Sequence, residues 1–249
     1  MLGQTEIERY DRQIRLGEIG AKGQERLKSS RVFIAGAGGL GSSVAFYLAA
    51  AGVGHLRLVD YDQVERSNLN RQILHWEQDI QRPKVLSAQE KLQSLNPDIR
   101  IEALQTKISE ENLPQLLQDC HLIVDALDNF TTRYLINKYA LFSGLPLFHG
   151  AISGFEGEIT TMIPGHTACL RCRYRGLVPE ETFPVLGTVP GIIGSLQACE
   201  VIKYIVGTGE LLLNRLLKYD GLKQQFLEFS IKPNPDCDHC SQTSIEDKK

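Results

Sequence analysis

The sequence has little net charge, because 27 lysines and arginines nearly balance 30 aspartates and glutamates in 249 residues. A formal charge of −3 creates no global field that would gather nucleic acid or anionic lipid. The chain also lacks an uninterrupted apolar run of about 18 residues, the length that a membrane helix needs. Its first twenty residues are too polar for a signal peptide. We therefore expect a soluble, cytoplasmic protein that binds neither nucleic acid nor membrane.

Internal repeats and low-complexity tracts are absent, and only residues 241–249 have the composition of a disordered tail. The shares of hydrophobic residues (42%) and charged residues (23%) are typical of globular proteins. No clear linker divides the chain. We expect a single domain over residues 1–249, with a nucleotide-binding half at about 1–150 and a second half at about 151–240.

Short apolar runs alternate with helix-forming segments in the first half. The predicted strands are residues 32–35, 55–60, 100–104, 122–127 and 145–149. The predicted helices are residues 40–51, 110–117, 131–142 and a segment that begins at Pro83, after a helical stretch at 6–28 broken by Gly17, Gly20 and Gly23. This alternation predicts an α/β fold of the Rossmann-like, doubly wound type with a mostly parallel sheet.

The second half has a different pattern. Extended segments are predicted at residues 152–163, a loop at 173–191 and a long apolar helix at 191–206. Residues 216–219 and 225–229 resemble a closing antiparallel pair of strands. We expect these strands to continue the parallel sheet in the antiparallel sense.

A glycine-rich turn joins the first predicted strand to the helix that follows it. The stretch G-A-G-G-L-G supplies Gly36, Gly38, Gly39 and Gly41 in G-x-G-x-x-G spacing. Small residues let backbone amides approach a phosphate, and the N-terminus of the helix attracts the anion. Asp60 ends the second strand, where a carboxylate can accept hydrogen bonds from ribose hydroxyls. The turn predicts a nucleotide site; a tight turn without a ligand is the alternative.

Two cations and a carboxylate are expected beside that turn. Arg71 lies in a polar cluster after Asp60, Lys84 lies at a helix start, and Asp128 follows a buried strand. All three project from the carboxyl edge of a doubly wound sheet. Arginine and lysine bind phosphates, and aspartate is a hard oxygen ligand for Mg²⁺. This set favours a triphosphate with Mg²⁺ over a nicotinamide dinucleotide.

Four of the six cysteines form two C-x-x-C pairs, Cys169 with Cys172 and Cys237 with Cys240. Four thiolates make a closed, tetrahedral, structural zinc site. Such a site would clip the end of the chain to the region before the proline-rich loop. A redox dithiol in either pair is the alternative. We interpret His239, inside the second pair, as a bystander.

Cys120 and Cys199 stand alone in apolar surroundings and are predicted to be small buried hydrophobic residues. His149, at the end of a strand, is expected to be a structural histidine with its hydrogen bonds satisfied. A place for His149 near the nucleotide site is the alternative.

Several motifs occur together in a characteristic order. They are R-Y-D-R-Q at 9–13, G-A-G-G-L-G at 36–41, D-Y-D at 60–62, S-N-L-N-R-Q at 67–72, the lysine after R-P, and D-A-L-D-N at 125–129. With these motifs, the chain resembles the ThiF/MoeB/HesA family, the bacterial relatives of ubiquitin-activating enzymes. The resemblance runs from about Ile7 to Ser241.

The resemblance implies an activity and its cofactors. Family members use ATP and Mg²⁺ to adenylylate the C-terminal glycine carboxylate of a small ubiquitin-like sulfur carrier that ends in Gly-Gly. The resemblance implies cofactor-binding roles for Gly36, Gly38, Gly39, Gly41, Asp60, Asp62, Asn68, Arg71, Lys84, Asp128 and Asn129, with Mg²⁺ on Asp128 and zinc on the four paired cysteines.

Arg12 resembles the arginine that reaches into the ATP site of the partner subunit, so a homodimer is also implied. The alternative is a solvated charge on a helix. Arg12, Arg71, Lys84 and Asp128 form the expected catalytic set.

The chain departs from some family members at one point. The loop at 174–191 contains no cysteine, although members that form a covalent link to the carrier have one there. This absence favours adenylylation alone, with sulfur supplied by a separate protein. The sequence leaves open whether the carrier is of the thiamine or the molybdopterin type. The competing functions are a non-catalytic, carrier-binding scaffold and an NAD(P)-dependent oxidoreductase.

Overall fold

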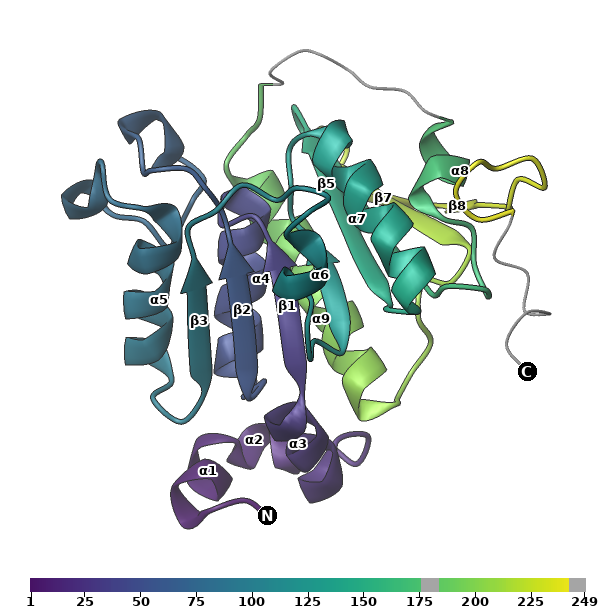
Figure 1. The fold of residues 1–249 in the computed structure, drawn as a ribbon. Helices are drawn as coiled ribbons and strands as arrows, with labels where there is room; N and C mark the ends of the chain where they lie inside the picture. The colour runs from purple at the N-terminus through teal and green to yellow at the C-terminus, as the bar shows by residue number, and fades with distance from the viewer. Residues whose placement is uncertain (176–183, 242–249) are drawn as a thin grey trace.

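The computed structural model of the chain describes residues 1–175 and 184–241 (Figure 1). The predicted disordered tail, apart from Ser241, and part of the predicted loop lie outside these residues. The strands are β1 (Arg31–Ala35), β2 (His55–Val59), β3 (Arg100–Leu104), β4 (Leu122–Asp125), β5 (Leu147–Ser153), β6 (Glu156–Met162), β7 (Arg215–Asp220) and β8 (Gln225–Ser230). The α-helices are α1 (Gln4–Arg9), α2 (Asp11–Ile14), α3 (Gly20–Ser29), α4 (Gly39–Ala50), α5 (Lys84–Leu95), α6 (Leu113–Leu116), α7 (Phe130–Ser143), α8 (Leu170–Tyr174) and α9 (Thr188–Val206). Two 3₁₀ turns are η1 (Arg66–Asn68) and η2 (Glu77–Asp79).

The eight strands within the described residues belong to one sheet in the order β3-β2-β1-β4-β5-β6-β7-β8. The first five are parallel, and β6, β7 and β8 extend the sheet in the antiparallel sense. The predicted fold, a doubly wound parallel sheet continued by antiparallel strands, is therefore confirmed.

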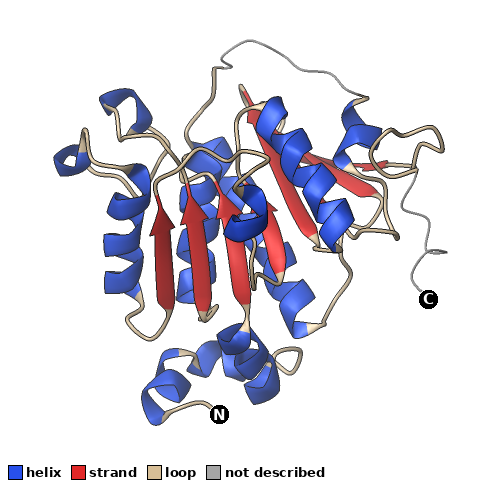
Figure 2. Ribbon diagram, viewed as in Figure 1, coloured by secondary structure: helices blue, strands red, loops and turns tan. Residues whose placement is uncertain are grey.

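Helices cover both faces of the parallel part of the sheet (Figure 2). Strand β1 shows why, because its side chains alternate between the two faces. Val32 and Ile34 pack in one core with α4, α5 and α9. Phe33 and Ala35 pack in a second core with α6 and α7. A strand buried on both faces has a continuous apolar sequence, and this is why the strand could be predicted from the sequence.

The N-terminal helical stretch differs from the prediction at one glycine. Gly23 lies inside α3 and does not break it. A Cβ at this position would stand 2.9 Å from the side chain of Val206, so the glycine allows α3 to approach the end of α9. Close packing against another helix, and not a chain break, accounts for this residue.

The helix α9 is long and apolar enough to cross a membrane by length and composition alone, although Glu200 and Lys203 interrupt its apolar run. Half of its most apolar window is buried inside the protein. The helix packs against α4 and against strands β5 and β6. It is therefore a core helix of this sheet.

Cys199 on α9 is exposed, so the predicted burial of this cysteine is wrong. Ile193, Gln197 and Val201 are buried and recur every four residues on the face toward the sheet. Cys199 stands two positions from both Gln197 and Val201, and therefore points to the opposite side of the helix. An apolar sequence around a cysteine did not reveal which side of the helix it occupies. Cys120, by contrast, is buried as predicted.

Candidate active site and cysteine cluster

A pocket of about 580 Å³ opens at the carboxyl edge of the parallel strands. The turns after β1, β2 and β4 line one part of it, and β5, β6 and α8 line another. The structure brings together nine of the residues singled out in the sequence, namely Gly36, Gly38, Gly39, Asp60, Asp62, Arg71, Lys84, Asp128 and Asn129. Their roles remain predictions.

The glycines of the turn between β1 and α4 are present for different reasons. Gly36 has φ +98°, and a Cβ on Gly41 would lie 2.0 Å from the carbonyl oxygen of Gly36. These two glycines are required by the fold, and Gly41 does not line the pocket. A Cβ on Gly38 would contact only Gln72, at 3.6 Å. The space around Gly38 therefore belongs to the pocket, next to the N-terminus of the twelve-residue helix α4.

Asp60 supports this turn from the end of β2. Its Oδ2 accepts a hydrogen bond from the backbone N–H of Ala37 at 2.8 Å, and its Oδ1 accepts one from that of Asp62 at 2.9 Å. Burial raises the pKa of Asp60 despite these two hydrogen bonds. The carboxylate thus fixes the glycine turn while it lines the pocket.

The cations of the pocket are held by neighbouring oxygens. The Nζ of Lys84 lies 2.8 Å from the carboxylate of Asp62, and the side chain of Lys84 is buried. Arg71 donates to the backbone oxygen of Ser67 and to Oδ1 of Asn70. Both cations stand beside the glycine turn, where they can neutralise phosphate oxygens.

The side-chain amides of the two asparagines expected at the site, Asn129 and Asn68, both make hydrogen bonds to the backbone. Asn129 lines the pocket and also caps α7, because its Oδ1 accepts from the N–H of Thr132 at 2.9 Å. Asn68 is buried outside the pocket lining, and its Oδ1 accepts from the N–H of Glu65 at 3.0 Å. Asn68 shapes the turn that carries Arg71.

A network of buried and partly buried hydrogen bonds adjoins the β5–β6 end of the pocket. His149 is fully buried, with Nδ1 at 2.7 Å from Oδ2 of Asp125 and Nε2 at 3.0 Å from the hydroxyl of Tyr174. The hydroxyl of Tyr174 in turn donates to Oε1 of Glu158, and Nη2 of Arg173 donates to Oε2 of Glu158 at 3.0 Å. His149 is therefore structural, as predicted. This hydrogen-bond network lies beside the site, because Glu158 and Tyr174 line the pocket.

Charge compensation keeps the two carboxylates of this hydrogen-bond network, Asp125 and Glu158, ionised. Burial opposes the charge on Asp125, but Arg133 and His149 outweigh it and lower the pKa of Asp125. Burial likewise opposes the charge on Glu158, while His149, Tyr174 and Arg173 lower the pKa of Glu158. Burial, followed by the charge of Glu158, raises the pKa of Tyr174.

Sequence reasoning missed several residues that line the pocket. They include Arg133, Glu158, Tyr174 and Lys218. Glu158 and Lys218 come from β6 and β7, whose residues gave only an extended pattern in the sequence. Arg133 lies on α7, four residues after the capping Asn129, so its place one turn into the helix could have indicated it.

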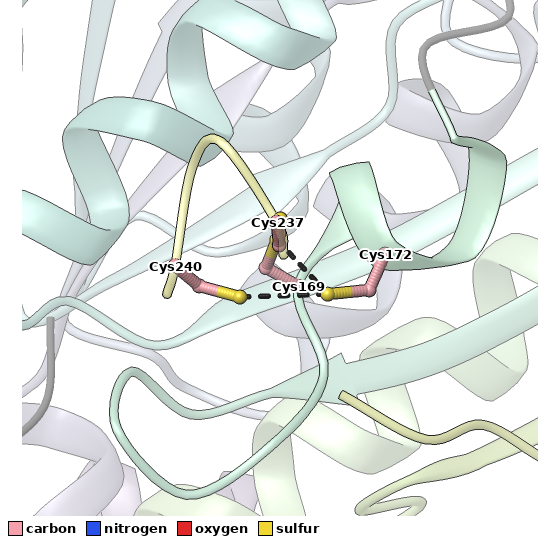
Figure 3. Close-up of side chains that lie close together, drawn as sticks. All are labelled: Cys169, Cys172, Cys237 and Cys240. Carbon is pink, nitrogen blue, oxygen red and sulfur yellow. Dashed lines mark hydrogen bonds between the residues drawn. The ribbon is translucent and has the colours of Figure 1, made fainter. Parts of the chain in front are cut away.

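The four paired cysteines come together at α8, far apart in the sequence but adjacent in space (Figure 3). Cys169 and Cys172 flank the start of α8, and Cys237 and Cys240 lie in the C-terminal segment. Three sulfur–sulfur distances are 3.9 Å (169–172), 3.7 Å (169–237) and 3.4 Å (172–240). A disulfide requires about 2.05 Å, so these sulfurs are not paired as disulfides.

The spacing of the sulfurs fits a tetrahedral metal. Thiolates 2.3 Å from a zinc ion define a tetrahedron with sulfur–sulfur edges of about 3.8 Å. All four sulfurs lie within 4.8 Å of one another. Burial raises the pKa of Cys169 to about 12, so without an ion this thiol is protonated at neutral pH. His239 stays outside the cluster, with its Nδ1 at 2.8 Å from the amide nitrogen of Asn137.

Arg12 lies on α2, close to α3, which leads into the amino end of β1 (Figure 1). The glycine turn follows the opposite, carboxyl end of the same strand. The side chain of Arg12 is exposed, and it is not among the residues that line the pocket. Within one chain, Arg12 and the pocket are therefore separated.

The sequence pattern of the ThiF family matches residues 10–239. The chain belongs to the ThiF family. This match covers the nucleotide turn, the β5–β6 end of the pocket and all but one of the clustered cysteines.

Two relatives in the ThiF family match almost end to end. The SAMP-activating enzyme E1 of Haloferax volcanii is 44% identical over 251 residues, which cover 98% of this chain and 93% of that protein. The sulfur carrier protein adenylyltransferase of Thermus thermophilus is 42% identical over 246 residues, which cover 94% and 91%. The crystal structure of E. coli MccB with ATP superimposes with a TM-score of 0.81 at 25% identity, covering 94% of this chain and 74% of that one.

Proposed function

We propose that this chain uses ATP and Mg²⁺ to adenylylate the C-terminal glycine carboxylate of a ubiquitin-like sulfur carrier, of the thiamine or molybdopterin type, and releases pyrophosphate. One observation carries the proposal. Arg71, Lys84 and Asp128 line the same pocket as Gly38 and Gly39, and this pocket continues along β5 and β6. The first part suits a triphosphate, and the second gives an extended peptide tail a path to it. The names of the two relatives and the ATP-bound neighbour agree with this function.

The chemistry requires charge neutralisation and no general base. A C-terminal carboxylate titrates near 3.5 and is already a nucleophile at neutral pH. The barrier arises because this anion approaches a polyanion and because negative charge grows on the leaving pyrophosphate. Among the described residues, no cysteine or histidine lines the pocket, and the proposed reaction requires neither.

The residues divide this task between them. The backbone amides around Gly38 and Gly39 bind phosphate oxygens, and Asp60 accepts from the ribose. Arg71 and Lys84 neutralise the charge that develops on the leaving group. Asp128 supplies a carboxylate oxygen for Mg²⁺, which would shield the phosphates. Lys84 is already oriented by its ion pair with Asp62.

The remaining parts of the proposal concern the assembly. The four clustered cysteines hold zinc, because their number and spacing fit that ion. The enzyme is a cytoplasmic homodimer in which Arg12 of each protomer completes the site of the other, because Arg12 does not reach the pocket of its own chain. A separate protein donates the sulfur.

Carrier-dependent ATP–pyrophosphate exchange tests the function. The assay takes each ubiquitin-fold protein ending in Gly-Gly that the source genome encodes, and the same proteins without the final glycine as controls. We expect exchange with at least one full-length carrier and with none of the truncated ones. Asp128→Ala abolishes exchange while the unfolding temperature stays near that of the wild type. A protein that binds the carrier but shows no exchange is the scaffold that the sequence left open, and the proposed function is then wrong.

A further inference from the structure

Helix α8 lies between the cysteine cluster and the pocket. Cys169 caps the start of α8 and Cys172 lies inside it, so this helix carries two of the four clustered sulfurs, and Tyr174 is its last residue. Only one residue separates Cys172 from Tyr174, and Tyr174 lines the pocket. Whatever fixes the cysteines therefore also fixes the position of Tyr174.

Tyr174 is held on several sides. Its ring packs edge to face on Phe130, with 4.7 Å between centroids, and on His149, with 5.7 Å. Its one hydroxyl proton goes to Glu158, and the hydroxyl oxygen also lies 3.0 Å from Nε2 of His149. Nδ1 of His149 lies 2.7 Å from Oδ2 of Asp125. The hydroxyl of Tyr174 thus joins two carboxylates through one histidine.

Glu158 is the residue of this hydrogen-bond network whose charge a ligand in the pocket would meet. Its side chain is 13% exposed and lines the pocket, and both of its oxygens are occupied by Tyr174 and Arg173. A carboxylate held and compensated in this way repels an incoming anion less than one that is free to turn into the pocket. The C-terminal carboxylate of a carrier is such an anion.

We propose that Tyr174 is a positioning residue through which the metal-bound cysteine cluster holds Glu158 against the pocket wall, so that the anionic tail of the carrier can enter. The inference rests on the proposed function for the identity of the tail, but the link between the cluster and Glu158 rests only on contacts within this chain. Zinc at this cluster then stabilises the carrier end of the pocket as well as the end of the chain.

The kinetic test uses Tyr174→Phe, which removes the hydroxyl and keeps the ring packing. We expect the KM for the carrier that supports pyrophosphate exchange to rise about tenfold, because Glu158, then held by Arg173 alone, can turn toward the like charge of the tail. The KM for ATP and kcat stay near the wild-type values. Tyr139→Phe, which removes a hydroxyl from α7 outside the pocket lining, is the matched control and leaves all three values unchanged.

A second substitution separates repulsion from general damage. The double variant Tyr174→Phe/Glu158→Gln removes the negative charge of the Glu158 carboxylate, so the carrier KM returns close to the wild-type value. The proposal is overturned if Tyr174→Phe leaves the carrier KM unchanged, if it raises the KM for ATP equally, or if Glu158→Gln does not rescue it.

Hydrogen exchange tests the metal link without any carrier, so it remains valid if the proposed function fails. On removing zinc with a chelator, we expect faster exchange of the amides of Arg173 in α8, of Arg175 at its C-cap, and of the β6 residues near Glu158. The amides of β1 stay protected. If chelation also exposes β1, the comparison of zinc-loaded wild type with zinc-loaded Tyr174→Phe decides, with faster exchange expected in β6. Exchange in β6 that does not respond in the deciding comparison overturns the link.

Discussion

Two side chains hold the single residue Ala37 in the middle of the glycine turn between β1 and α4. Asp60 accepts from its N–H, and Nε2 of His75 lies 2.9 Å from its carbonyl oxygen. Nδ1 of His75 lies 2.9 Å from the hydroxyl of Ser87 on α5. His75 is 3% exposed. A buried imidazole with both nitrogens engaged thus ties the turn to the helix that begins with Lys84.

This histidine predicts a pH dependence of stability. Burial is the main cause that lowers the pKa of His75, so the folded protein keeps it neutral. The unfolded chain takes up the proton near pH 6.5 and the folded chain only at a lower pH. The contribution of His75 to stability is therefore intact above about pH 6.5 and is lost as the pH falls through that value toward the folded pKa.

Urea unfolding of the wild type, His75→Gln and His166→Gln between pH 8 and 5 measures the effect. We expect the wild type to lose more free energy of unfolding on acidification than His75→Gln does. His166 is exposed, and its substitution should leave the wild-type pH profile unchanged. Equal losses in the wild type and His75→Gln would contradict the assignment.

At the scale of elements, the turn between β1 and α4 separates glycines needed by the fold from those needed by a ligand. We expect Gly41→Ala to destabilise the protein by several kcal/mol, because its Cβ would overlap the oxygen of Gly36 at 2.0 Å. Gly38→Ala should leave the unfolding temperature nearly unchanged, since its Cβ contacts only Gln72 at 3.6 Å. The same Cβ occupies space that phosphates require, so ATP affinity falls. Thermal unfolding and ATP titration of both variants check the contrast; ATP binding by Gly38→Ala at wild-type affinity would remove the phosphates from this turn.

Most elements were predictable because a strand or helix is encoded by neighbouring residues. The strand Arg100–Leu104 has the predicted bounds, and the buried strands β1 and β4 end within two residues of theirs. The predicted helix at 110–117 shortens to Leu113–Leu116, whose first turn contains a proline. Which face a residue occupies depends on what packs against the helix, and this is why Cys199 was misplaced.

At the scale of the whole molecule, contacts between segments that are distant in the sequence could not be predicted. Glu158 and Tyr174 meet because β6 and α8 adjoin the same pocket, and no periodicity in either segment encodes that meeting. The glycine turn, Arg71, Lys84 and Asp128 were foreseen because a doubly wound sheet brings the carboxyl ends of its strands to one edge. The approach of the two C-x-x-C pairs was foreseen because two such pairs are typical of a four-thiolate zinc site, whose ligands must lie close together.

The separation of Arg12 from the pocket of its own chain leads to a prediction about the assembly. Arg12→Ala and Asp128→Ala should each abolish pyrophosphate exchange. If Arg12 acts in trans, a mixed dimer of the two variants has one intact site, with Asp128 from one protomer and Arg12 from the other. Random reassortment of subunits makes half of the dimers mixed, so the mixture should recover about a quarter of the wild-type activity. Incubating the two variants together after mild dissociation, and measuring exchange against each variant alone, gives the answer. Activity that does not return, in a mixture shown by mass spectrometry of the intact complex to contain the mixed dimer, would assign Arg12 to the solvated surface of α2.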